Sequence, residues 1–109
     1  MLFNRFSVVC SIVSLVSALI LDTPSSQWYS GEDVIVTWQE QPTGDPVFTL
    51  VLASSVSPIG LAIASDISPA LGSLAITVPD VQPGSYVLEA VNVTNNSDIY
   101  AETALFKIL

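Results

Sequence analysis

Few side chains in this 109-residue chain could carry out acid–base or nucleophilic chemistry. The sequence contains no histidine, and its single cysteine, Cys10, lies in an apolar N-terminal run. Ser–His and Cys–His nucleophile systems are therefore excluded, and so are the usual zinc ligands. A Ser–Lys pair would have to use Lys107, which we expect to point outward from the last strand. The sequence predicts no catalytic residue, no metal ligand and no cofactor.

Paired carboxylates are the remaining route to catalysis, because a glycoside hydrolase needs two of them across a cleft. The chain has ten acidic residues. Those considered for this role are Glu32, Asp33, Glu40, Asp45 and Glu89. Nearly all lie in turns or beside turn-forming residues, where acidic side chains are usually solvated. The acidic turn from Ser30 to Asp33 could offer oxygen ligands to calcium, but its spacing matches no known calcium loop. We interpret these carboxylates as surface charges and predict a non-catalytic protein.

Two N-glycosylation sequons carry more information. Asn92-Val93-Thr94 and Asn95-Asn96-Ser97 both satisfy the acceptor rule. Strand alternation continued from Tyr86 points Asn92 inward, so Asn95, in the Asn-Asn-Ser-Asp turn, is the predicted carrier. Asn92 could be modified only if its strand ended or bulged before it. A sequon also needs surface exposure, so the alternative that neither is modified stays open.

The N-terminal run predicts a signal peptide over residues 1–18. Arg5 supplies a weakly basic start, Phe6 to Val16 is apolar apart from serines, and Val16-Ser17-Ala18 offers small residues suited to cleavage. The run is short for a membrane span, which needs about 20 apolar residues. An uncleaved membrane anchor is the alternative.

Cleavage would leave residues 19–109 as one domain without Cys10, and so without a disulfide in an oxidising compartment. Residues 19–109 contain one basic residue, Lys107, and ten acidic residues, which gives a net charge of −9. Such a surface repels phosphate backbones and anionic lipid, so we exclude nucleic-acid partners. The sequence predicts an acidic, secreted, extracellular domain with no membrane span after cleavage.

The stretch from Trp28 to Trp38, WYSGEDVIVTW, organises the predicted fold. Its Ser-Gly-Glu-Asp segment has the residues of a turn, and Val34 to Trp38 is rich in β-branched and aromatic residues. Alternation places Val34, Val36 and Trp38 on one face, which we predict to be the core side.

Further short strands are expected along the chain, separated by turn-forming residues. Val47 to Ala53 is apolar on both faces, which is typical of a central strand. In Leu74 to Val78 and in the strand that contains Tyr86, Leu88 and Ala90, alternate residues face inward. The expected strands are Leu19–Thr23, Val34–Trp38, Val47–Ala53, Ile59–Ala64, Leu74–Val78, Ser85–Val93 and Tyr100–Leu109, the last with Ala104, Phe106 and Ile108 inward.

About seven short strands without a sustained helical period predict an all-β fold, an antiparallel β-sandwich of immunoglobulin or fibronectin III type. Tyr86 follows Pro83-Gly84 and is either a tyrosine corner or an ordinary buried tyrosine.

The order of several landmarks resembles the N-terminal domain of a fungal cell-wall-synthesis family. They are Leu21-Asp22-Thr23-Pro24, Trp28, Gly31, Val34–Trp38, Pro83-Gly84-Ser85-Tyr86 and Phe106-Lys107-Ile108. That family includes yeast proteins needed for β-1,6-glucan and Ser/Thr-rich, GPI-anchored wall proteins of filamentous and mushroom-forming fungi. The resemblance spans residues 19–109. It implies a role in wall assembly or β-glucan organisation, with β-glucan or wall proteins as partners.

Two departures from the family pattern affect what we expect. Family members often carry a Ser/Thr-rich stalk and a GPI signal, whereas this sequence stops at Leu109 without that signal, so we expect release or non-covalent retention in the wall. The family also tends to show a serine before its final Phe-x-Ile, where this chain has Ala104 and Leu105.

The two functional hypotheses use different surfaces. If the domain binds glucan, aromatic rings near turns would stack on sugar rings, and the candidates are Trp28, Tyr29 and Tyr100. The alternative is a secreted adhesion or effector module that binds another protein through a sheet face or edge. Its motivation is the apolar strand Val47–Ala53 and the outward positions Val87, Val91 and Val93.

Overall fold

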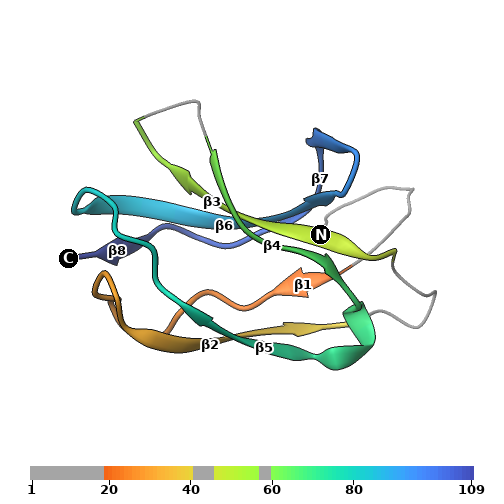
Figure 1. Cartoon of the computed structure of the whole chain (residues 1–109), viewed down its shortest axis with the longest axis horizontal. Coiled ribbons are helices and arrows are strands. Elements are labelled where there is room, and N and C mark those ends of the chain that lie inside the picture. The colour runs from red at the N-terminus through yellow and green to blue at the C-terminus, as the bar shows by residue number, and fades with distance from the viewer. Residues whose placement is uncertain (1–18, 41–45, 57–59) are drawn as a thin grey trace, which may run out of the picture.

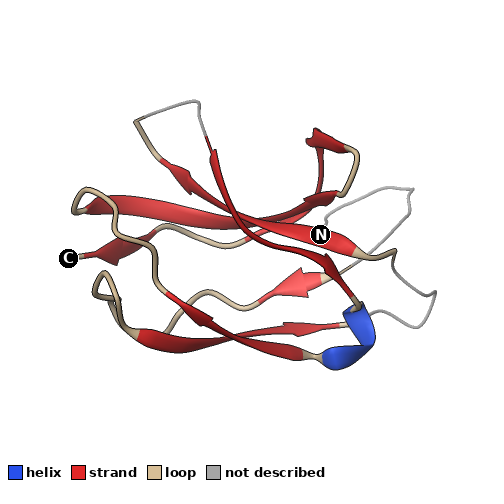
Figure 2. Cartoon of the chain, viewed as in Figure 1, coloured by secondary structure: helices blue, strands red, loops and turns tan. Residues whose placement is uncertain are grey.

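The computed structural model describes residues 19–40, 46–56 and 60–109, which form two antiparallel β-sheets packed face to face (Figures 1 and 2). The predicted signal peptide, residues 1–18, lies outside the described residues. The strands are β1 (Ile20–Leu21), β2 (Asp33–Gln39), β3 (Phe48–Ser54), β4 (Gly60–Ile67), β5 (Ser73–Thr77), β6 (Gly84–Asn92), β7 (Asn95–Glu102) and β8 (Phe106–Ile108). Within this part of the chain, no helix is long and apolar enough to cross a membrane.

The smaller sheet has the order β1-β2-β5, and the larger has the order β4-β3-β6-β7. The strand β8 pairs with the Gly84–Tyr86 end of β6, while β7 pairs with its Glu89–Asn92 end. Every pairing between named strands is antiparallel. The predicted all-β sandwich is therefore confirmed, and β3 lies between β4 and β6 as its two-sided apolar pattern indicates.

The core lies between the sheets. Val36 and Trp38 of β2 are buried, and Val34 is half-buried, so the predicted core face of this strand is confirmed. The rings of Trp38 and Phe48 meet edge to face with centroids 5.3 Å apart. Trp38 also donates its indole N–H to the backbone oxygen of Pro69 at 2.8 Å, which satisfies the one polar atom of its ring.

The final strand predicted from Tyr100 to Leu109 is wrong, because the structure divides it into β7 and β8. Thr103 lies at the division and is buried. Its backbone N–H donates to the oxygen of Leu88 at 2.9 Å, and its Oγ1 accepts the Leu88 N–H at 3.0 Å. The Thr103 hydroxyl thus accepts the hydrogen bond that a backbone oxygen would accept in a continuous strand pair, and the strand is interrupted at Thr103. As a result Ala104, predicted inward, is exposed, whereas Phe106 and Ile108 are inward as predicted.

The segment from Asp66 to Gly72, predicted as a loop, contains the end of β4 and a 3₁₀ turn. β4 continues to Ile67, and Asp66 has a positive φ of 55° where the register between β3 and β4 shifts. A 3₁₀ turn over Pro69–Leu71 then carries the chain from one sheet to the other (Figure 2). A bulge adds an extra residue to one strand and so interrupts the alternation of inward and outward residues. A prediction based on that alternation therefore ends the strand too early.

Tyr86 is both a buried tyrosine and a tyrosine corner. Its side chain is 8% exposed, and its hydroxyl donates to the backbone oxygen of Gln82, four residues upstream. This bond holds the loop before β6 against the strand. The loop, from Asp80 to Pro83, is therefore fixed in position at one end of the sandwich.

Candidate functional site

The predicted stacking residue Trp28 lies in the core. It is 5% exposed, and its ring meets Phe106 edge to face with centroids 4.8 Å apart. Its backbone N–H donates to Lys107 and its oxygen accepts from Leu109, both at 2.9 Å. Because Trp28 pairs with the chain at β8 in this way, its indole lies between the two sheets. Stacking needs an open ring face, so the prediction that Trp28 stacks on sugar is wrong.

The two tyrosine candidates do not form a common platform. Tyr29 is 51% exposed and lies next to the end of β8, whose Ile108 pairs with Gly84 of β6. Tyr100 is half-buried against the core and lies on β7, beside the Ala90 level of β6. Six residues of β6 separate these levels, a span of roughly 20 Å at about 3.3 Å per residue. Of the three candidates, Tyr29 is the one with an exposed ring.

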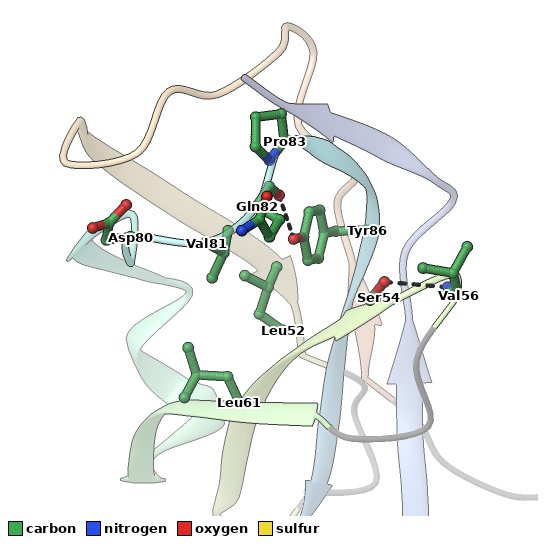
Figure 3. A pocket seen from close by; sticks show the side chains of 9 residues that line it. All are labelled: Leu52, Ser54, Val56, Leu61, Asp80, Val81, Gln82, Pro83 and Tyr86. Atoms are coloured by element: carbon green, nitrogen blue, oxygen red, sulfur yellow. Dashed lines mark hydrogen bonds between the residues drawn. The ribbon is translucent and has the colours of Figure 1, made fainter.

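A groove lies at one end of the sandwich. It has a volume of about 840 Å³. Figure 3 shows the loop from Asp80 to Pro83 along one side, with Leu52 and Leu61 opposite. Its lining residues are Leu52, Ser54, Val56, Leu61, Asp80, Val81, Gln82, Pro83 and Tyr86. They come from the end of β3, the turn after it, the start of β4, the loop before β6, and β6 itself.

The groove is apolar at its base and has both apolar and polar residues at its rim. Leu52, at 2% exposure, closes the base, while Leu61 is 46% and Val56 is 91% exposed. The polar groups are the Asp80 carboxylate, the Gln82 amide and the Ser54 hydroxyl, which accepts the Val56 N–H at 3.2 Å. Asp80 is the one ionisable carboxylate in the lining, so a carboxylate pair is absent there. The groove is suited to binding a neutral or cationic ligand.

Sequence reasoning missed this groove, although it placed several of its residues in a turn and in strands. The Asp80–Gly84 turn and the strand around Leu61 lie about 20 residues apart, and their proximity is a property of the tertiary fold. The tyrosine corner is the one sequence signal that could have indicated it, since Tyr86 fixes the loop that forms one wall.

The carboxylates considered for catalysis do not gather at the groove. Glu32 accepts the Tyr29 N–H at 3.0 Å, and Asp33 accepts the Thr77 hydroxyl at 2.9 Å; both bonds are exposed. Glu40 is exposed as well, and Asp45 lies outside the described residues. These contacts are the ordinary hydrogen bonds of surface turns and strands.

Glu89 lies close to a second carboxyl group, because Glu102 of β7 is directly opposite it in the pairing of β6 with β7. Burial raises the pKa of the Glu89 carboxyl, and the hydrogen bond to Glu102 and its negative charge raise that pKa further. Neither residue lines the groove. The groove therefore does not place a glycosidic bond between these two carboxyl groups.

The outer face of β6 differs from the exposed valine surface that was predicted. Val91 is fully buried, at 0% exposure, and Val87 is half-buried. Val91 lies between Thr49 of β3 and Ile99 of β7, which cover it from both sides. Val93, in the turn after β6, is exposed. Val91 thus lies on the outer face of β6 as predicted, but it is covered by its neighbours and offers no exposed surface.

The sequons lie at the β6–β7 hairpin. Asn92 ends β6 and is half-buried, whereas Asn95 opens β7 and is exposed. The turn is Val93-Thr94, so the predicted turn at Asn95–Asp98 is wrong. The pairing of β6 with β3 stays in register from Tyr86 to Asn92, which lies opposite the buried Phe48, so Asn92 is on the inward face of β6 as predicted. The pairing of β6 with β7 shifts on both sides of Val91 because β7 contributes the extra residues.

Comparison with known families gives one match. A family model described as a Kre9/KNH-like N-terminal Ig-like domain matches residues 23–108, which include seven of the eight strands in full. No curated protein matches the chain.

Proposed function

This chain belongs to the Kre9/KNH-like family, which is associated with fungal cell-wall β-1,6-glucan synthesis, and on that premise we propose a non-catalytic role in organising wall β-glucan. In this proposal the domain is secreted and acts at the cell wall. The observation that carries the proposal is the family match over residues 23–108.

The groove is the proposed contact for the glucan chain. A glucan is uncharged, and it offers apolar C–H faces as well as hydroxyl groups. Leu61, which is 46% exposed, would contact the sugar faces, while Asp80 and Gln82 at the rim would hydrogen-bond to hydroxyls. A neutral ligand also approaches this acidic protein, of net charge −8, without repulsion.

A sedimentation assay on insoluble polysaccharide tests the proposal. The purified protein is mixed with β-1,6-glucan, β-1,3-glucan or chitin, beside Leu61→Asn in the groove. Ile35→Gln is the control, because Ile35 is 67% exposed on the outer face of the other sheet and glutamine creates no sequon with Thr37. Retention on glucan that Leu61→Asn lowers and Ile35→Gln leaves unchanged supports the proposal. Retention on no polymer means that direct glucan binding is wrong.

A second candidate function is protein binding through the same end of the molecule. Val56 and Leu61 are exposed large apolar residues at the groove, and β4 is an edge strand of the larger sheet. Light scattering after size-exclusion chromatography measures self-association. Concentration-dependent dimers that Leu61→Asn dissociates, together with no polysaccharide retention, would favour this function.

A further inference from the structure

Two sequons border a single tight turn. β6 ends at Asn92, β7 begins at Asn95, and these two residues are paired across the hairpin with Val93 and Thr94 between them. Residues directly opposite one another in an antiparallel pair have Cβ atoms about 4.5–5.5 Å apart. Two branched glycans on such neighbours would collide near their first sugars. The hairpin therefore has room for one glycan.

The local geometry of the two sequons is the same. Thr94 donates both its backbone N–H and its hydroxyl to Oδ1 of Asn92, each at 2.9 Å. Ser97 donates in the same way to Oδ1 of Asn95, at 3.1 Å and 2.6 Å. This is the turn that an asparagine side chain forms with the residue two positions later. Oδ1 accepts hydrogen bonds in both sequons, so it does not distinguish them. The sequons are therefore compared at Nδ2, the atom to which an N-linked glycan is attached.

At Nδ2 the two asparagines differ clearly. Nδ2 of Asn92 donates to Oδ2 of Asp98 at 3.1 Å, and the Asn92 side chain is half-buried at the end of the ladder. Within the described part of the chain, no hydrogen bond uses Nδ2 of Asn95, and this residue is exposed. A sugar on Asn95 thus displaces no contact of the folded domain.

Asn95 also lies on the edge strand β7 of the larger sheet. Among the described strands β7 is the last of the larger sheet, so one edge of its backbone has no partner strand among them. The residues from Asn95 to Ile99 are all exposed. An unpaired strand edge can add a strand from another molecule, and a bulky hydrophilic group beside it prevents that approach.

We propose that the β6–β7 hairpin carries a single N-linked glycan, on Asn95, and that this glycan shields the free edge of β7. The inference rests on the proposed function in one respect, the entry of the chain into the secretory pathway. The donor is a lipid pyrophosphate-linked oligosaccharide. A bond forms between Nδ2 of Asn95 and the anomeric carbon of the first sugar, the bond from that carbon to the pyrophosphate oxygen breaks, and Nδ2 loses one proton as the lipid pyrophosphate leaves.

The test expresses the full chain in a yeast host in two forms, one with its own N-terminus and one behind a secretion leader of the host. Intact mass is measured before and after an enzyme that removes N-linked glycans. With the host leader, we expect the mass of one glycan, lost in Asn95→Gln and in Ser97→Ala but kept in Asn92→Gln and in Thr94→Ala. Two glycans, no glycan, or a glycan that persists in Asn95→Gln would overturn the assignment.

The two forms separate failure of this inference from failure of the proposed function. If the host-leader form carries the Asn95 glycan while the natural form stays inside the cell without one, secretion is wrong and the site assignment is upheld. Shielding is measured by comparing self-association of glycosylated protein with secreted Ser97→Ala, which keeps Asn95. We expect a larger dimer fraction for Ser97→Ala; equal fractions would overturn the shielding role.

Discussion

Single aromatic side chains attach the loops of this sandwich to its core. Trp38 donates its indole N–H to Pro69 in the turn between the sheets, and Tyr86 donates its hydroxyl to Gln82 in the loop beside the groove. Trp28 packs on Phe106 and pairs through its backbone with the end of the chain. Each ring therefore combines apolar burial with one satisfied polar group or with backbone pairing, which is how large aromatic residues stabilise a small domain.

The burial of Trp28 gives a prediction about stability. Trp28→Ala removes a ring that is 5% exposed and leaves a cavity beside Phe106, so we expect a loss of about 3–5 kcal/mol in the free energy of unfolding. Tyr29→Ala is the control, because Tyr29 is 51% exposed and its loss should cost less than about 1 kcal/mol. Urea denaturation measures both. Equal losses would contradict the buried position of Trp28.

The Glu89–Glu102 pair gives a prediction about pH. The ordinary pKa of Glu89 is 4.5, and the folded state raises it, so the folded state binds this proton more tightly than the unfolded state. The stabilising contribution is complete below the unfolded pKa and is lost as the pH rises through the folded pKa. Among the described residues no positive charge lies beside the pair, since Val51 lies opposite Glu89 on β3 and Lys107 pairs with Ser85, four residues away along β6.

Glu89→Gln and Glu102→Gln should both flatten this pH dependence, because each removes one of the two interacting carboxyl groups. The measurement is the thermal midpoint of unfolding between about pH 4 and pH 7. We expect the wild-type midpoint to fall more than that of either variant over this range. The same fall in all three proteins would show that the pair contributes nothing.

At the scale of elements, one hydroxyl divides the C-terminal strand. Thr103 occupies a buried position between β7 and β8, where its Oγ1 accepts from Leu88 and its backbone donates to the same residue. The chain on either side then pairs with different ends of β6. This division lets β7 form a sheet edge near the sequons while β8 closes the core beside Trp28.

Removing that hydroxyl tests its role. Thr103→Val keeps the shape of the side chain but leaves the buried Leu88 N–H without its Oγ1 acceptor, so we expect a loss of about 1–3 kcal/mol in stability. Thr103→Ser retains the acceptor and should lose less. Chemical denaturation compares the two, and hydrogen exchange at the Leu88 amide reports directly on the bond. Thr103→Val as stable as wild type would mean that the hydroxyl is not needed there.

The elements show what sequence patterns can and cannot predict. Alternation located the core faces of β2, β5 and β6 because each of these faces packs against the other sheet. It failed at Thr103 and Asp66, where a side-chain hydrogen bond or a positive φ interrupts a strand. It could not place Trp28, since an aromatic residue beside a turn is equally compatible with burial and exposure. The groove was beyond its reach because residues far apart in sequence form it.

For the whole molecule, charge limits what can bind. The chain has 10 acidic residues against 2 basic ones, a net charge of −8. In the described part of the chain, Lys107 is the one basic residue. A protein partner with a basic surface would be attracted by this charge, whereas a neutral glucan would depend on apolar contacts and hydrogen bonds. Binding of a basic partner and binding of glucan therefore respond differently to ionic strength.

Salt dependence thus separates glucan binding from binding of a basic protein partner. The Debye length falls from about 30 Å at 0.01 M salt to about 8 Å at 0.15 M, so attraction between opposite charges weakens over this range. Retention on β-1,6-glucan should change by less than about twofold, because the polymer has no charge for salt to screen. Binding to a basic protein should weaken by about tenfold or more, since its association rate depends on electrostatic attraction. Glucan retention that falls steeply with salt would contradict a groove that binds a neutral chain.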